Sequence, residues 1–163
     1  MASSSNVFRP ASKVLLQSMK ILVINGPNLN LLGVREPDIY GNRSYADLVK
    51  FIGGVAKDCG VEVEVRQTNH EGVIVDWIQE CRGKFDALVI NAAAYTHTSV
   101  AIHDAIKAVQ VRTVEVHLSD PKRRDDFRKV SFIESVAEKT CSGRGFESYA
   151  DAIRHLALDG REK

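Results

Sequence analysis

KILVIN, at residues 20–25, is the stretch that decides the fold class, because it is apolar on both faces of a strand. Next comes SYADLVKFIGGVAKDCG (44–60), which predicts a helix with Ser44 as its N-cap and Gly60 at its end. The pair Gly53-Gly54 weakens this helix and indicates a close packing contact. VEVEVRQ (61–67) then alternates at period two, as expected of an edge strand.

The same alternation continues along the chain. Strands are predicted at 86–91, 112–119 and 135–141, and helices at 71–83, 98–109 and 146–160. About five strand–helix units predict an all-parallel sheet with helices on both faces. The sequence therefore predicts a flavodoxin-like three-layer sandwich with a five-stranded parallel sheet in the order 2-1-3-4-5.

Composition sets the limits of the interpretation. The 163 residues are 44% hydrophobic and 26% charged, with a net charge of +1, which fits one globular domain over 20–163. No basic stripe indicates a nucleic-acid partner, and no apolar run is long enough to span a membrane. Three widely spaced cysteines fit a reducing, cytoplasmic setting. Residues 1–19 are serine-rich and without acids, so we expect a disordered leader or an added extension, with an organelle transit segment as the alternative.

Polar side chains collect where the predicted strands end. Strand one is followed by NGPN (25–28), strand two ends in QTNHE (67–71), strand three is followed by NAAAYTHTS (91–99), and strand four ends in EVHLS (115–119). Because the carboxyl ends of parallel strands lie at one edge of a sheet, and ligands bind there, we expect the active site at this edge.

The segment VEVH contributes an acid pair. Period two places Glu115 and His117 on the same face of one strand, about 7 Å apart at the backbone. A carboxylate in this position holds the imidazole in one tautomer and favours its protonated form, which is what a general acid requires.

The loop after the first strand is long and polar, and Gly33, Pro37 and Gly41 give it fixed bends, as in a lid. Tyr40 lies on this loop with Arg35 five residues before it. Ionising an unperturbed tyrosine near neutral pH costs roughly 4 kcal/mol, and a nearby guanidinium offsets much of that cost. The alternative is that Tyr40 packs its ring and Arg35 is solvated.

Further donors follow strands three and four. Asn91 and His97, with the hydroxyls of Thr96, Thr98 and Ser99, supply neutral groups, and Asp104 lies two helical turns beyond His97. After strand four, the N–H groups of Leu118 and Ser119 can bind a carboxylate, with Arg124 or Arg128 as cationic partners.

The missing motifs narrow the reaction class. The sequence contains no Walker loop, no G-x-G-x-x-G, no G-x-S-x-G elbow and no cluster of metal ligands, so no cofactor or metal is expected. What remains is an acid–base site with a phenol, an imidazole, amides and cations. Such a site suits proton abstraction beside a carbonyl and loss of a hydroxyl from a small polyhydroxy acid.

Four segments in this order and spacing resemble the signature segments of type II 3-dehydroquinate dehydratases. They are INGPNLNLLGVREPDIYG (24–41), NHEGVIVDWI (69–78), NAAAYTHTSVAIHDAI (91–106) and VEVHLSDPKRRDDFR (114–128). The resemblance covers about residues 20–160. It implies the flavodoxin-like fold and a cofactor-free trans dehydration of 3-dehydroquinate to 3-dehydroshikimate, in the shikimate pathway or in quinate breakdown.

The resemblance also implies roles for individual residues. Tyr40 would be the tyrosinate base that takes the proton at C2, with Arg35 lowering its pKa. Asn28 would hold a water that stabilises the enolate, and His117, oriented by Glu115, would protonate the departing C1 hydroxyl. The substrate's hydroxyls and carboxylate would be bound by Asn91, His97, Leu118, Ser119 and Arg128.

The resemblance further implies a homo-oligomer, a dodecamer built from trimers, in which Asp104 would be supplied across a subunit contact. His103 stands where arginine is expected in many relatives, and this difference concerns that contact. Three alternatives remain open on the same scaffold. They are a hydrolase that uses Ser99 and His97, a flavin-binding module, and a non-catalytic binding module.

Overall fold

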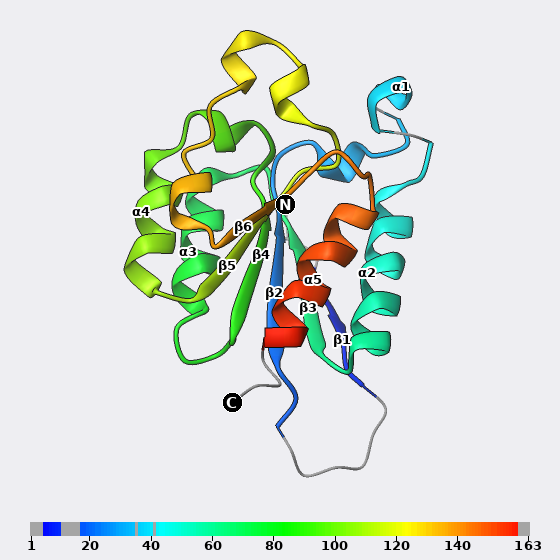
Figure 1. Ribbon diagram of the computed structural model, residues 1–163, viewed down its shortest axis with the longest axis vertical. Helices are drawn as coiled ribbons and strands as arrows, with labels where there is room; N and C mark the ends of the chain where they lie inside the picture. The colour runs from blue at the N-terminus through cyan, green and yellow to red at the C-terminus, as the bar shows by residue number, and fades with distance from the viewer. Residues whose placement is uncertain (1–4, 11–16, 35, 41, 160–163) are drawn as a thin grey trace.

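A computed structural model describes residues 5–10, 17–34, 36–40 and 42–159. One six-stranded sheet in the order β1-β3-β2-β4-β5-β6 forms the centre of the molecule (Figure 1). Its strands are β1 (Ser5–Phe8), β2 (Lys20–Asn25), β3 (Glu62–Gln67), β4 (Ala87–Asn91), β5 (Arg112–Val116) and β6 (Lys139–Cys141). The α-helices are α1 (Pro37–Tyr40), α2 (Tyr45–Cys59), α3 (Glu71–Glu80), α4 (Val100–Val109) and α5 (Glu147–Asp159). Short 3₁₀ helices are η1 (Leu29–Leu31), η2 (Ala93–His97), η3 (Pro121–Arg123), η4 (Asp126–Arg128) and η5 (Glu134–Val136).

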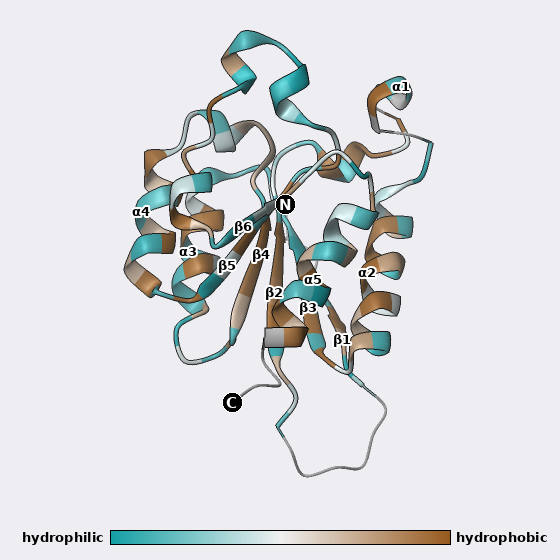
Figure 2. Ribbon diagram, in the orientation of Figure 1, coloured by the Kyte–Doolittle hydropathy of each residue, from teal (hydrophilic) through white to brown (hydrophobic). Residues whose placement is uncertain are grey.

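Two hydrophobic cores lie on opposite faces of the sheet. In β2, Ile21 and Val23 pack into the core under α2 and α5, whereas Leu22 and Ile24 pack into the core under α3 and α4. Because both faces of β2 are covered by helices, residues 21–24 are all apolar, with alternate side chains in different cores. Figure 2 shows the apolar central strands between two helical layers, with polar loops beyond the strand ends.

The predicted five-strand parallel core is confirmed. β3, β2, β4, β5 and β6 pair in parallel and lie in the expected order 2-1-3-4-5. Helix α2 also begins and ends as predicted. The Ser44 hydroxyl accepts from the N–H of Asp47, the Asp47 carboxylate accepts from the N–H of Ser44, and Gly60 closes the helix at φ 68°.

The prediction that every strand is parallel is wrong, because residues 5–8 of the predicted leader form a strand. These residues form β1, which pairs antiparallel with β3, so that β3 is the second strand and not the edge. The Phe8 ring lies over Gly53 of α2, where a Cβ would come within 2.5 Å of the ring. The close contact expected at Gly53-Gly54 is therefore made by Phe8. The hydrophobic pattern of residues 20–163 does not indicate this partner.

Three element boundaries differ from the predictions for local reasons. Helix α4 begins at Val100 and not at Thr98, because Ser99 is its N-cap and accepts from the N–H of Ile102. Residues 134–136 form η5, so that β6 is confined to 139–141. Strand β5 ends at Val116, although the N–H of His117 still bonds to the carbonyl of Cys141 beside it.

Candidate active site

A pocket lies beyond the carboxyl ends of β2, β4 and β5, at the edge where the sequence predicted it. The structure lines it with residues from the loops that follow these three strands. They are Pro27, Asn28, Leu29, Leu32, Asn91, Ala93, Ala94, His97, His117, Leu118, Ser119, Pro121, Arg124 and Arg128. Most of the binding residues expected from the sequence thus lie around one cavity.

The loops after β2 and β4 approach each other closely at Gly26. Its N–H donates to the carbonyl of Asn91 at 2.8 Å, and a Cβ on Gly26 would lie 2.5 Å from the carbonyl oxygen of Ala92. Only glycine fits this approach. The chain then turns at Asn28, which has a left-handed backbone (φ 68°) and donates its N–H to the Asn69 side chain at 3.0 Å. Asn28 is thereby fixed at the mouth of the pocket.

A hydrogen bond to a buried tyrosine orients the Asn91 amide. Its Nδ2 donates to the hydroxyl of Tyr149 at 2.8 Å, and that hydroxyl donates to Oδ1 of Asn25 at 2.6 Å. The Asn91 Oδ1 accepts from the N–H of Ala93 at 3.2 Å. Because Tyr149 is fully buried, its pKa is raised above that of an ordinary phenol, so it stays a neutral donor. Asn91 therefore offers its second Nδ2 hydrogen to the pocket.

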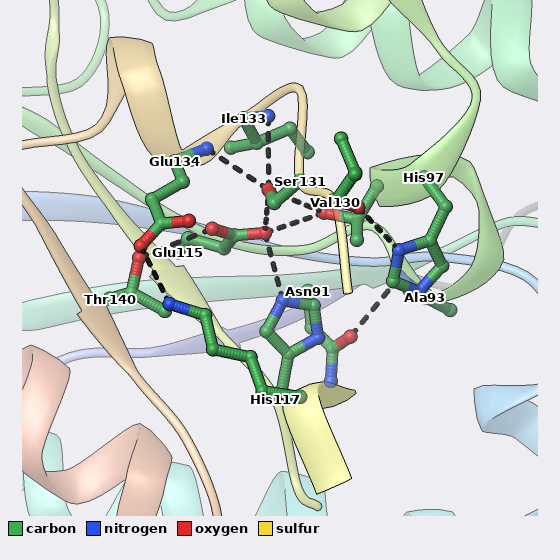
Figure 3. A network of polar contacts seen from close by, with 12 residues as sticks. Asn91, Ala93, His97, Glu115, His117, Val130, Ser131, Ile133, Glu134 and Thr140 are labelled. Carbon is green, nitrogen blue, oxygen red and sulfur yellow. Dashed lines mark hydrogen bonds and ion pairs between the residues drawn. The ribbon is translucent and has the colours of Figure 1, made fainter. Parts of the chain in front are cut away.

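The structure brings the side chains of Glu115 and His117 into contact. The Nε2 of His117 lies 2.8 Å from Oε1 of Glu115 (Figure 3). The Glu115 side chain is completely buried, and that of His117 is 10% exposed. His117 lines the pocket, and no hydrogen bond of its Nδ1 occurs in the described part of the chain. The imidazole is thus anchored through one nitrogen and leaves the other available to a ligand.

Glu115 receives hydrogen bonds from several parts of the fold. Its Oε1 accepts from Thr96 Oγ1 at 2.5 Å, from Ser131 Oγ at 2.7 Å and from His117, and its Oε2 accepts from Thr140 Oγ1 at 3.2 Å. Burial by itself raises the pKa of this carboxyl, but the hydrogen bonds and charge of His117, with the two hydroxyls on Oε1, outweigh it. The pKa of Glu115 is therefore lowered, and the group is a carboxylate.

The surroundings of His97 favour its neutral form, with the hydrogen on Nδ1. Its Nδ1 lies 2.7 Å from the carbonyl oxygen of Val130, which requires the hydrogen to be on Nδ1. Burial, with the neighbouring His117 and Arg128, lowers the pKa of His97 although the Val130 carbonyl opposes this. A neutral His97 presents an unprotonated Nε2, which is an acceptor for a hydroxyl group.

The segment after β5 supplies the other donors that the sequence predicted. Leu118 and Ser119 line the pocket, and their backbone N–H groups make no hydrogen bond within the described residues. Arg124 and Arg128 line the same pocket, and Arg128 bonds through Nε to the Asp125 carboxylate at 3.3 Å. This side of the pocket is suited to an anionic group.

Three predicted residues are not brought to the pocket by the described part of the structure. Asp104 is exposed on α4, binds His103 Nδ1 at 2.9 Å and does not line the pocket. His97 lies in η2, before α4 begins, so the two residues do not follow each other on one helix. Arg35 and the side chain of Tyr40 lie outside the described residues. Their neighbour Glu36 comes within 4.0 Å of Arg124, so this loop approaches the pocket rim.

Sequence reasoning missed three residues that orient the site. Ser131 and Thr140 bind Glu115, and Tyr149 binds Asn91. Ser131 and Thr140 lie in the polar stretch and the short strand after β5, where nothing in the local pattern distinguishes them. Tyr149 gave a detectable signal, because it is an aromatic residue with a polar tip on the apolar face of the closing helix.

The described residues contain no group of three or more His, Cys, Asp or Glu side chains arranged to hold a metal ion. Over the same residues, no helix has the length and apolarity needed to cross a membrane. Cys81 and Cys141 are buried thiols, and burial raises the pKa of Cys81 to about 12. Neither is a nucleophile at neutral pH.

Comparison with known proteins places this chain in a family. The model of the family described as "Dehydroquinase class II" matches residues 19–157. The chain belongs to the class II dehydroquinase family. The family match begins at residue 19 and so does not include β1, which precedes it.

Relatives within the class II dehydroquinases are similar over nearly their whole length. The 3-dehydroquinate dehydratase of Campylobacter hominis is 54% identical over 142 residues, which cover 87% of this chain and 88% of the relative. The type II dehydroquinase structure from Butyrivibrio crossotus is 48% identical with a TM-score of 0.84, covering 85% of this chain and 97% of that one. The structure from Propionibacterium acnes is 38% identical with a TM-score of 0.83, covering 88% and 100%.

Proposed function

We propose that this chain catalyses the cofactor-free trans dehydration of 3-dehydroquinate to 3-dehydroshikimate, as a hydro-lyase. The observation that carries the proposal is the buried Glu115–His117 pair opening onto a pocket of neutral donors and arginines. A proton donor, hydroxyl-binding groups and cations are what a polyhydroxy cyclic acid requires. Membership of the class II dehydroquinase family supports this substrate.

The reaction divides between two faces of the substrate. Tyr40, ionised with the help of Arg35, takes the proton from C2, and the electron pair is held as an enolate on the C3 carbonyl. Asn28 binds the water that stabilises this oxygen. The C1–O bond then breaks, His117 gives its proton to the departing hydroxyl, and water leaves. Glu115 stabilises the imidazolium that donates this proton.

The substrate is bound by groups whose hydrogen-bonding roles are already fixed. Asn91 offers an N–H and His97 offers an acceptor nitrogen, both to ring hydroxyls. The N–H groups of Leu118 and Ser119, with Arg128, bind the carboxylate. This assignment uses every expected binding residue except Asp104.

Asp104 enters the proposal through assembly. We infer a homo-oligomer, a dodecamer built from trimers, in which Asp104 reaches the site of a neighbouring protomer. Its exposed position on α4 supports a role outside its own pocket. The buried, reduced thiols Cys81 and Cys141 support a cytoplasmic location. Both the shikimate pathway and quinate breakdown are compatible with the chemistry.

The test is formation of the conjugated enone, followed by its ultraviolet absorbance, when purified chain is mixed with 3-dehydroquinate. The proposal predicts turnover without added metal or cofactor. Borohydride added with substrate should leave the activity intact, because no lysine forms a Schiff base. Absence of turnover, or covalent trapping on a lysine, would contradict the proposed mechanism.

The hydrolase alternative is disfavoured by the position of Ser99. Its hydroxyl accepts from the N–H of Ile102 as a helix cap, the residue is 2% exposed, and it does not line the pocket. A serine nucleophile needs an accessible hydroxyl with a base beside it.

A further inference from the structure

We propose that Ser131 is a positioning residue of the acid pair, and that its hydroxyl orients Glu115 and through it His117. This inference rests on the catalytic roles proposed above for Glu115 and His117. Ser131 lies between η4 and η5, in the connection from β5 to β6. Its hydroxyl contacts the buried Glu115 carboxylate at 2.7 Å (Figure 3).

The direction of the Ser131 hydroxyl hydrogen is determined by its partners. A hydroxyl has one hydrogen to donate and two lone pairs to accept with. The Ser131 Oγ accepts from the N–H of Ile133 at 3.1 Å and from the N–H of Glu134 at 3.0 Å. With both lone pairs engaged, its hydrogen is directed to Oε1 of Glu115, 2.7 Å away. Thr96, 3.5 Å from the Ser131 Oγ, directs its own hydrogen to the same oxygen.

Ser131 and His117 share one carboxylate oxygen. Both bind Oε1 of Glu115, so the position of that oxygen sets the position of the His117 ring. Oε2 is held only by Thr140, at the longer distance of 3.2 Å, within the described part of the chain. Removing the Ser131 hydroxyl therefore loosens the carboxylate at the oxygen that anchors the imidazole.

The segment that carries Ser131 is itself fixed to the site. The Val130 carbonyl binds Nδ1 of His97 at 2.7 Å, and the N–H of Phe132 donates to the carbonyl of Thr96 at 2.9 Å. Two consecutive residues thus reach both histidines, since Val130 contacts His97 directly and Ser131 contacts His117 through Glu115. The two contacts make separable predictions, because His97 is proposed to bind substrate and His117 to act in the chemical step.

The experiment compares Ser131→Ala with Ser135→Ala by steady-state enone formation. Ser135 is a matched control on the same segment, since its exposed hydroxyl bonds only to the carbonyl of Phe132, at 3.4 Å, within the described residues. We expect Ser131→Ala to lower kcat by about tenfold or more while KM stays within about twofold, as for an interaction that matters in the chemical step. Ser135→Ala should leave both constants within about twofold of wild type.

A double variant tests whether Ser131 acts through Glu115. In Glu115→Gln the amide oxygen can take the Oε1 position and the NH₂ can face Thr140, so the side chain still fits. Adding Ser131→Ala to Glu115→Gln should lower kcat by less than about threefold further, because residues acting as a unit are not additive. If Ser131→Ala does not fold, Ser131→Cys replaces it, since a thiol of similar size is a weak donor.

Three results would overturn the inference: a Ser131→Ala kcat within about twofold of wild type, a loss confined to KM, or full additivity with Glu115→Gln. Failure of the proposed function would look different. In that case the wild-type chain would not turn over 3-dehydroquinate, or Glu115→Gln would turn it over at the wild-type rate.

Discussion

At the scale of single residues, Glu115 is the centre of the site, because it is a fully buried carboxylate whose donors come from several parts of the fold. Its pair with His117 could be predicted from period two alone. The hydroxyls of Ser131 and Thr140 could not, because they reach Glu115 from 16 and 25 residues further along the chain. The hydrophobic pattern of a strand predicts which face a residue occupies. It does not predict which hydroxyl from a distant part of the chain will contact that residue.

The buried carboxylate makes the stability of the fold depend on pH. Because the folded-state pKa of Glu115 is lowered below its ordinary value, its contribution to stability is present above that ordinary value and is lost as the pH falls through the folded one. We expect the free energy of unfolding, measured by denaturant titration, to fall on acidification below about pH 4.5. Glu115→Gln should show a shallower decrease. An identical pH dependence in the two proteins would contradict this assignment.

The close approach at Gly26 gives a second prediction at this scale. An added Cβ would lie 2.5 Å from the Ala92 carbonyl oxygen, and backbone cannot move aside as a flexible side chain can. Gly26→Ala should therefore separate the loops after β2 and β4, raise KM for 3-dehydroquinate and lower the free energy of unfolding by about 1–3 kcal/mol. Steady-state kinetics and denaturant unfolding measure the two effects. Unchanged values in both would show that the loops adjust freely.

At the scale of secondary-structure elements, β1 is where the prediction and the structure differ most. The five parallel strands and the caps of α2 follow from local pattern, but β1 pairs with a strand more than fifty residues away, and its anchor is the Phe8 ring on Gly53. The two glycines at 53–54 indicated that some group packs closely against α2. The sequence did not indicate that this group is Phe8, because the four residues of β1 are too few to show the alternation typical of a strand.

The adjacent glycines in α2 offer a matched test of that contact. Gly53 is buried under the Phe8 ring, whereas a Cβ on Gly54 would meet no atom within 4 Å. Gly54→Ala should stabilise the protein by about 0.5–1 kcal/mol through helix propensity. Gly53→Ala should lose that gain and displace β1, raising amide hydrogen exchange in residues 62–67. Equal stabilisation by both substitutions, measured by denaturant unfolding, would show that β1 does not pack on Gly53.

At the scale of the whole molecule, the parallel sheet concentrates the ends of its strands at one edge, and this topology is why polar residues distant in sequence form one pocket. Several large apolar side chains outside the pocket are exposed. Phe127 is 68% exposed and Val130 is 59% exposed, both on the segment after β5, with exposed Val100 on α4. Exposed large apolar side chains such as these are candidates for an interface between subunits.

These exposed side chains test the proposed assembly. We expect Phe127→Glu to shift the sedimentation coefficient toward smaller species, because a carboxylate cannot be buried there without a partner. Lys50→Glu, at an exposed position of α2 on the opposite face of the sheet from α4, is a charge-changing control. Wild-type chain that sediments as a monomer, or a Phe127→Glu variant that assembles normally, would contradict the proposed homo-oligomer.

The most direct measurement of the central claim is the initial rate of enone formation from 3-dehydroquinate by the wild-type chain, Tyr40→Phe and His117→Asn, side by side. A base and an acid on opposite faces of the substrate predict rapid turnover by wild type and a fall of about 100-fold or more in each variant, with substrate binding by Tyr40→Phe largely retained. Rates within a few-fold of wild type in either variant would contradict the account.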